Sequence, residues 1–309
     1  MTFAAGATGV LALANMEQKA YAQGLMERRR RARLDAFATP ATPPTTDVKA
    51  SWKVGVTDWD IRATGRLSSF AVAKELGFEG VQATYDPNPD APDSLANRAN
   101  RPRFLAAARE AGLDIASFCI GALNGRPLAT TPEAEGWVED CLNAMEEMNV
   151  PQVLIPFFGR ANPDVRESRH HLPMITEKLK RLAAIAEQKN KILAIESFLS
   201  AEANIGLISS IGSDAVKVYY DTHNTWYWGL DIYHEIDLLA SRKLISEIHL
   251  KDEARLGDGD IDFPRVCVLL EKYGYEGWLV FEVAPGAATD AWRETHAVDA
   301  HFIKRLIGR

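Results

Sequence analysis

Four side chains that can bind a metal ion stand at the ends of four apolar segments in the second half of the chain. These residues are Glu196, Asp221, His249 and Glu282. An ionised carboxylate is costly to bury without a partner, and three carboxylates that meet at one site repel each other. A divalent cation relieves both costs. The set therefore predicts a site for Mn²⁺, which we favour, or for Mg²⁺, Co²⁺ or Zn²⁺.

Each of these residues also has an ordinary structural explanation when it is taken alone. Glu196 could be a buried acid paired with an arginine, and Asp221 could cap the helix that follows it. His249 could be a hydrogen-bonded core histidine, and Glu282 could form a salt bridge. The similar position of all four, at the ends of separate apolar segments, favours one shared site.

Short apolar runs alternate with helix-like segments along most of the chain. The runs typical of strands are 53–58, 79–85, 114–120, 152–158, 192–198, 216–222, 245–251 and 277–283. The helix-like segments are 67–76, 101–112, 131–149, 167–190, 201–211, 231–242, 263–273 and 289–307. Eight strands, each followed by a helix, predict a (β/α)8 TIM barrel, in which the carboxyl ends of the strands share one mouth. The alternative, an open doubly wound sheet, expects a glycine-rich turn after the first strand, and GVTDWDIRATG lacks one.

The first 48 residues are predicted to be an extension that precedes a barrel of residues 49–309. Residues 2–14 are apolar and Ala20-Tyr21-Ala22 resembles a cleavage site, but a positive segment before them is missing. This region is interpreted as a truncated export signal or as a packed helix. A basic helix (26–37) and a Pro/Thr linker (39–47) follow. We expect a cytoplasmic protein, or a periplasmic one if residues 1–22 are an export signal.

The composition disfavours several other classes of protein. A formal net charge of −7 disfavours a nucleic-acid binder, which usually presents a basic face. Cys119, Cys141 and Cys267 lie far apart without CxxC spacing, which disfavours disulfides and a structural zinc site. The apolar run at the N-terminus is too short to span a membrane as a helix.

The motifs AIESFLSAE, YYDTHN, EIHLKD, LGDGDIDF and VFEV, in this order, resemble those of the sugar isomerase/epimerase superfamily with a xylose-isomerase-like TIM barrel. The resemblance covers roughly residues 52–307. It implies that the four candidate ligands bind one divalent ion. It also implies that Glu196 and Glu282 act as the catalytic acid and base.

The same resemblance suggests which residues contact the substrate. The ketose epimerases of this superfamily contact the substrate with residues at the places of Glu202 and Arg255. Asn224, preceded by His223, stands where those epimerases often have a histidine, and this departure weakens an assignment to the ketose epimerases proper. Lys251 is expected to contact a substrate oxygen, or else to pair with the aspartate that follows it.

Several aromatic residues could pack on the apolar face of a sugar at the mouth of the barrel. The candidates are Trp59, Phe157, Phe158, Trp226 and Trp228, of which we select Trp59 and Phe158. The alternative for each is ordinary packing in the core or in a loop.

These inferences predict a metal-dependent sugar isomerase or epimerase that acts on a keto-sugar or polyol through an enediolate. A metal-dependent lyase or dehydratase that acts on keto-sugars or oxidised glycosides is the alternative. An inactive barrel that serves as a binding subunit is less favoured. So is a nuclease like endonuclease IV, because the first histidine is His170 and the early strands supply no imidazole. The expected partner is a small sugar, with no nucleic acid and no stable membrane span, and the helical outer face is compatible with a homo-oligomer.

Overall fold

The computed structural model describes residues 48, 50–158, 171–253, 255–283 and 291–309. The predicted export signal, basic helix and Pro/Thr linker therefore lie outside the described residues. No helix in the described ranges is long and apolar enough to cross a membrane.

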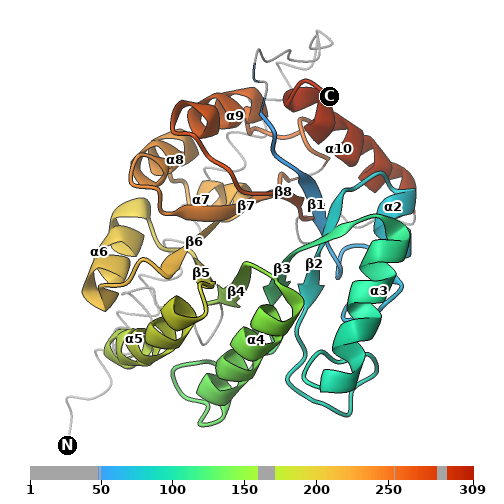
Figure 1. The fold of residues 1–309 in the computed structure, drawn as a ribbon. Coiled ribbons are helices and arrows are strands. Elements are labelled where there is room, and N and C mark those ends of the chain that lie inside the picture. Colours follow the sequence, from blue (N-terminus) through green and yellow to red (C-terminus); the bar gives the residue numbers. More distant parts are fainter. Residues whose placement is uncertain (1–47, 49, 159–170, 254, 284–290) are drawn as a thin grey trace, which may run out of the picture.

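Eight parallel strands close into a barrel in chain order, with β8 paired to β1 (Figure 1). The strands are β1 (Val54–Thr57), β2 (Gly80–Thr84), β3 (Asp114–Cys119), β4 (Gln152–Pro156), β5 (Ile192–Glu196), β6 (Val216–Asp221), β7 (Ile245–Leu250) and β8 (Leu279–Phe281). Each lies within the corresponding predicted run. The predicted (β/α)8 fold is therefore confirmed, because strands buried on both faces are continuous apolar runs that can be recognised locally.

Helices surround the barrel on its outside (Figure 1). They are α2 (Ser69–Glu75), α3 (Arg101–Ala111), α4 (Ala134–Met148), α5 (Leu172–Gln188), α6 (Ala201–Ile211), α7 (Thr222–Tyr227), α8 (Ile232–Ala240), α9 (Phe263–Lys272) and α10 (Trp292–Leu306). Two short 3₁₀ helices are η1 (Arg98–Asn100) and η2 (Gly121–Asn124). The helix α7 and both 3₁₀ helices were not predicted, since turns this short leave little periodicity in a sequence.

The ends of several helices follow from local chemistry. Gly112 ends α3 with a φ of 69°, a left-handed conformation that costs glycine little. Asp262 caps α9 by accepting a hydrogen bond from the backbone N–H of Arg265. Ser200 caps α6 in the same way through Ala203 N–H, which fixes the turn after β5.

The apolar core lies mainly between the strands and the helices, and only a small apolar cluster occupies the inside of the barrel. Cys119, Leu154, Ala194 and Tyr219 make up this inner cluster, with Trp59 packed against it. The remaining interior positions include buried polar side chains from several strands. All three cysteines are buried and free, in agreement with the predicted absence of disulfides.

Candidate active site

The four predicted metal ligands meet at the carboxyl end of the barrel. Glu196, Asp221 and His249 come from the ends of β5, β6 and β7, and Glu282 directly follows β8. One potential ligand atom from each residue lies within 4.8 Å of the others. The barrel creates this proximity, because Asp221 and His249 are partners in the β6–β7 register although 28 positions separate them in the sequence.

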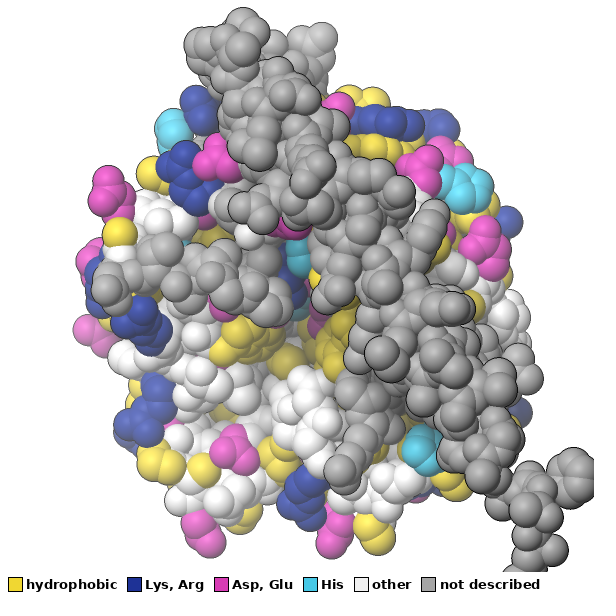
Figure 2. All heavy atoms as spheres, turned by 180° about the vertical axis from the view of Figure 1, so that it is seen from behind, with side chains coloured by type: hydrophobic (Ala, Val, Ile, Leu, Met, Phe, Trp, Pro, Cys, Tyr) yellow, Lys and Arg dark blue, Asp and Glu magenta, His cyan; other side chains and the backbone are white. Residues whose placement is uncertain are grey.

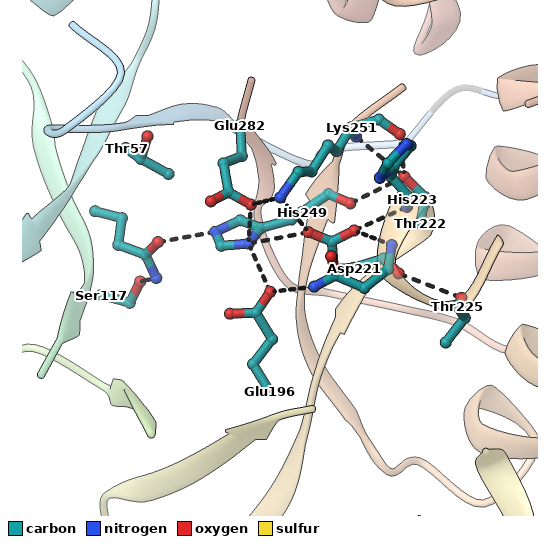
Figure 3. Close-up of polar contacts among 12 residues, drawn as sticks. Thr57, Ser117, Glu196, Asp221, Thr222, His223, Thr225, His249, Lys251 and Glu282 are labelled. Atoms are coloured by element: carbon teal, nitrogen blue, oxygen red, sulfur yellow. Dashed lines mark hydrogen bonds and ion pairs between the residues drawn. The ribbon is translucent and has the colours of Figure 1, made fainter. Parts of the chain in front are cut away.

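His249 lies at the centre of the cluster (Figure 3). Its Nδ1 atom is 3.2 Å from Glu282 Oε2, 3.5 Å from Glu196 Oε1 and 3.8 Å from Asp221 Oδ2. All four residues are buried or nearly so, and the side chains of His249 and Asp221 are inaccessible to solvent. Four ionisable groups are thus packed together away from water.

The electrostatics of this cluster show the strain that an ion would relieve. Burial, opposed by the Lys251 ammonium and reinforced by the Glu282 and Glu196 carboxylates, raises the pKa of Asp221 to about 7. Although burial disfavours an imidazolium, the Glu282 and Glu196 carboxylates raise the pKa of His249 to about 10. Without an ion, the imidazole therefore acts as the counter-charge of the acids.

The donor set fits a divalent cation. Asp221 Oδ2 and His249 Nδ1 are buried and have no hydrogen-bond partner. Two buried atoms of ligand type that face each other without a hydrogen bond are a pattern that a bound ion explains. When the three carboxylates are ionised, Lys251 offsets one of their charges, and the two that remain match a divalent ion.

Lys251 joins the cluster from the position directly after β7, the strand that supplies His249. Its Nζ atom is 2.9 Å from Glu282 Oε2 and 3.3 Å from Asp221 Oδ2. Lys251 therefore pairs with Glu282 and Asp221, and not with the following aspartate as the predicted alternative had it. Asp252 instead accepts hydrogen bonds from the backbone N–H groups of Glu253 and Gly259 and holds the loop after β7.

Two further donors orient the glutamates. Asn224 Nδ2 donates to Glu196 Oε1 at 3.0 Å, and Trp59 Nε1 donates to Glu282 Oε1 at 3.3 Å. Asn224 is held by Asp221, whose Oδ1 accepts from the backbone N–H groups of His223 and Asn224 at 2.8 Å each. Asp221 thus caps α7 with one oxygen and faces the cluster with the other.

A cavity of about 630 Å³ opens beside this cluster. Its lining includes Glu196, Asn224, Lys251 and Glu282 from the cluster and its surroundings. The lining also includes Tyr85, Cys119, Leu154, Pro156, Phe158 and Phe198. Figure 2 views the molecule from behind relative to Figure 1 and shows hydrophobic side chains gathered around a hollow near the middle of the face.

The five aromatic side chains considered from the sequence lie in three different surroundings. Trp59 and Phe158 line the cavity, as selected. Phe157 and Trp226 are buried in the core between strands and helices. Trp228 is outside the described lining, and its ring packs against Phe198.

Three predicted substrate contacts lie outside the described lining of the cavity. Glu202 has a side chain that is 64% exposed and lies 3.8 Å from His234. Arg255 forms an exposed ion pair with Asp258. The His223 ring packs against Trp226 and Tyr227.

Sequence reasoning missed a group of polar residues inside the barrel. They are Gln82, Ser117, Gln152 and Glu247, which are all buried. A signal was present, because each is a polar residue within a run predicted to be a buried strand. It also missed Asp60, whose Oδ2 accepts from Thr57 Oγ1 at 2.6 Å and from Val283 N–H at 2.9 Å, beside Glu282.

Comparison with known sequences gives a family match and several distant relatives. The family model described as "Xylose isomerase-like TIM barrel" matches residues 70–305. A 2-epi-5-epi-valiolone 7-phosphate 2-epimerase of Actinoplanes sp. is 26% identical over 180 residues, which cover 58% of this chain and 65%, slightly under two thirds, of that relative. The L-ribulose-5-phosphate 3-epimerase UlaE of Salmonella heidelberg is 23% identical, with 74% of this chain and 83% of the relative covered.

Solved structures share the fold. A 3-keto-D-glucoside 4-epimerase, YcjR, from E. coli superposes with a TM-score of 0.63 at 18% identity and covers 81% of this chain and 100% of that one. A D-psicose 3-epimerase superposes with a TM-score of 0.69 at 14% identity, with 83% and 100% covered. At these identities the superpositions establish the architecture only. The family match extends over most of the chain, and the protein therefore belongs to the xylose isomerase-like TIM barrel family.

Proposed function

We propose that this protein is a sugar epimerase or isomerase that works with one divalent metal ion, with Mn²⁺ as our preferred assignment. The observation that carries the proposal is the meeting of three carboxylates and one imidazole at the edge of a cavity large enough for a sugar. The names of the relatives support it, because those cited above are epimerases of sugars or sugar-like compounds.

Glu196, Asp221, His249 and Glu282 would hold the ion. A bound divalent ion would act as a Lewis acid on adjacent oxygens of a keto-sugar and make the C–H beside the carbonyl more acidic. Asp221 Oδ2 and His249 Nδ1 support this assignment most directly, because both are buried atoms of ligand type that lack a hydrogen bond and lie among charged members of the cluster.

Glu196 and Glu282 are suited to proton transfer. They extend toward the cluster from opposite sides (Figure 3), from β5 and from the residue after β8. A carboxylate on one side can take the proton from a carbon, and a carboxylic acid on the other side can return one. Return to the same carbon from the opposite face gives an epimer, whereas return to the neighbouring carbon gives an isomer. The two-sided placement favours epimerisation.

Lys251 and Asn224 support these glutamates without transferring protons themselves. Although burial favours a neutral amine, the Asp221 and Glu282 carboxylates hold the pKa of Lys251 well above its usual range. Lys251 therefore stays charged and offers a fixed donor to a substrate oxygen that gains negative charge. Asn224 fixes Glu196 through the hydrogen bond described above.

Incubation of the protein with Mn²⁺ and a panel of keto-sugars in D₂O tests the proposal. We expect deuterium at a carbon beside the carbonyl, without loss of a substituent, and we expect EDTA to stop the exchange. A new enone or a released alcohol would instead assign the chain as a lyase. Full occupancy by Mn²⁺ with no exchange on any keto-sugar would favour a binding subunit.

A further inference from the structure

A continuous path of hydrogen bonds runs from His249 into the interior of the barrel. His249 Nε2 lies 2.9 Å from Gln82 Oε1, and Gln82 Nε2 donates to Ser117 Oγ at 2.9 Å. Ser117 Oγ in turn donates to Glu247 Oε1 at 3.2 Å. Gln152 Nε2 donates to the other oxygen of Glu247. All of these side chains are buried.

Each hydrogen bond of the path has a definite donor and acceptor, because the side chains in it have few hydrogen atoms to donate. When Glu247 accepts through both of its oxygens, from Ser117 Oγ and from Gln152 Nε2, the one hydroxyl hydrogen of Ser117 is used, and Ser117 Oγ accepts its other bond. Only the amide nitrogen of Gln82 can donate that bond. The amide oxygen of Gln82 is then turned toward His249, and an oxygen there can only accept.

The orientation of the Gln82 amide determines which nitrogen atom of the His249 ring carries the hydrogen. With an acceptor fixed beside Nε2, the hydrogen of a neutral imidazole stays on Nε2, and the lone pair stays on Nδ1. Nδ1 is the atom that lies near the Glu196, Asp221 and Glu282 carboxylates. The sheet sets this arrangement, since Gln82 and Ser117 are register partners on β2 and β3, on the opposite side of the barrel from β7.

We propose that Gln82, oriented by Ser117 and Glu247, is a positioning residue that fixes His249 with its Nδ1 lone pair toward the ion. This inference rests on the proposed metal site. It goes beyond that site because it assigns a role to residues that contact neither ion nor substrate. Partners of this kind, which hold the second nitrogen of a metal-binding histidine, typically change metal affinity by about 10–100-fold when they are removed.

Gln82→Met and Gln152→Met make a matched pair of variants. Both remove an interior amide of equal size from the same polar layer, but only Gln82 touches His249. Titration calorimetry with Mn²⁺ is expected to show a dissociation constant about 10–100-fold higher for Gln82→Met. Gln152→Met should stay close to the wild-type value. Ser117→Ala, which frees the Gln82 amide to turn, should give a smaller rise. Circular dichroism verifies that each variant is folded.

The wild-type protein supplies a second measurement, for which a variant is needed only to assign the signals. Nitrogen-15 spectra of histidine-labelled, Zn²⁺-loaded protein are expected to show Nε2 protonated and Nδ1 bound to the ion, with the His249 signals assigned by their loss in His249→Gln. Zinc on Nε2 would overturn the proposal, and so would equal affinities of Gln82→Met and the wild type. If the wild-type protein binds neither Mn²⁺ nor Zn²⁺, the metal site itself fails and this inference falls with it.

Discussion

Asn224 Nδ2 donates a hydrogen bond to Glu196 Oε1, although the two residues belong to successive strand–helix units of the barrel. Asn224 lies in the first turn of α7, and Asp221 caps that helix. One candidate ligand therefore helps to position the residue that holds another. Because each side chain here has several contacts, substitutions must be chosen so that these roles can be told apart.

Glu196→Gln and Glu282→Gln should each lower turnover by about two to four orders of magnitude, because glutamine cannot carry the transferred proton. The measurement is deuterium exchange on the best keto-sugar substrate at saturating Mn²⁺. The bound metal must be quantified in parallel, so that loss of a ligand is distinguished from loss of a base. If both variants turned over at nearly the wild-type rate with Mn²⁺ bound, neither glutamate would be the catalytic group.

Glu202→Gln tests a point on which the family resemblance and the structure differ. The resemblance places this acid at the substrate, whereas the structure leaves its side chain 64% exposed beside His234. We expect turnover and KM close to the wild-type values. A rise in KM comparable with that of a cavity variant such as Phe158→Ala would show that Glu202 reaches the substrate after all.

Asp221→Asn and Asp221→Ala separate the two roles of this residue. An asparagine keeps an oxygen for the N–H groups of His223 and Asn224 but places an amide where Oδ2 faces the cluster. Asp221→Asn is expected to lose Mn²⁺ affinity and to keep its unfolding free energy in EDTA. Asp221→Ala should lose both, with a stability cost of about 0.5–2 kcal/mol for the missing cap. Calorimetry and urea unfolding measure the two effects.

Binding of Mn²⁺ should stabilise the folded protein, because the cluster exists only when the barrel brings the strands together. At a free concentration 100 times the dissociation constant, the unfolding free energy should rise by about 2.7 kcal/mol. Urea unfolding with and without EDTA measures this difference. His249→Ala supplies the control, since at the same Mn²⁺ concentration its gain in stability should be much smaller.

Glu235, which is not one of the candidate ligands, makes the unfolding free energy depend on pH. It accepts a hydrogen bond from Ala201 N–H at the start of α6, and burial raises its pKa to about 7. The folded protein therefore holds this proton more tightly than the unfolded chain does. The stability contributed by the protonated form is complete below about pH 4.3 and is lost as the pH rises through 7.

Glu235→Gln keeps an acceptor for Ala201 and cannot titrate. Relative to this variant, the wild type should lose on the order of 1–3 kcal/mol of unfolding free energy between pH 4.5 and pH 7.5. Urea titrations over that range measure the difference. A gap between the two proteins that stays constant, or widens in favour of the wild type as the pH rises, would contradict the raised pKa.

The sequence alone was sufficient for the architecture and for the candidate ligands. Strands buried on both faces are continuous apolar runs, and the longer helices repeat their apolar residues every three or four positions, so both can be recognised without knowing any distant contact. The fold then has a fixed consequence for residues such as Glu196 and His249. In a parallel barrel every strand ends at the same mouth, so acids and imidazoles at strand ends must meet there.

Only the tertiary structure decided which side chains face inward and what they touch. Glu202 lies six residues after Glu196, the last residue of β5. The capped first turn of α6 nevertheless directs its side chain toward His234 and the solvent. Gln82 and His249 are 167 positions apart, and their contact depends on closure of the barrel from β2 across to β7. Local sequence patterns report which residues are buried, but the partner of a buried polar group is set by strand register and barrel closure, which connect distant parts of the chain.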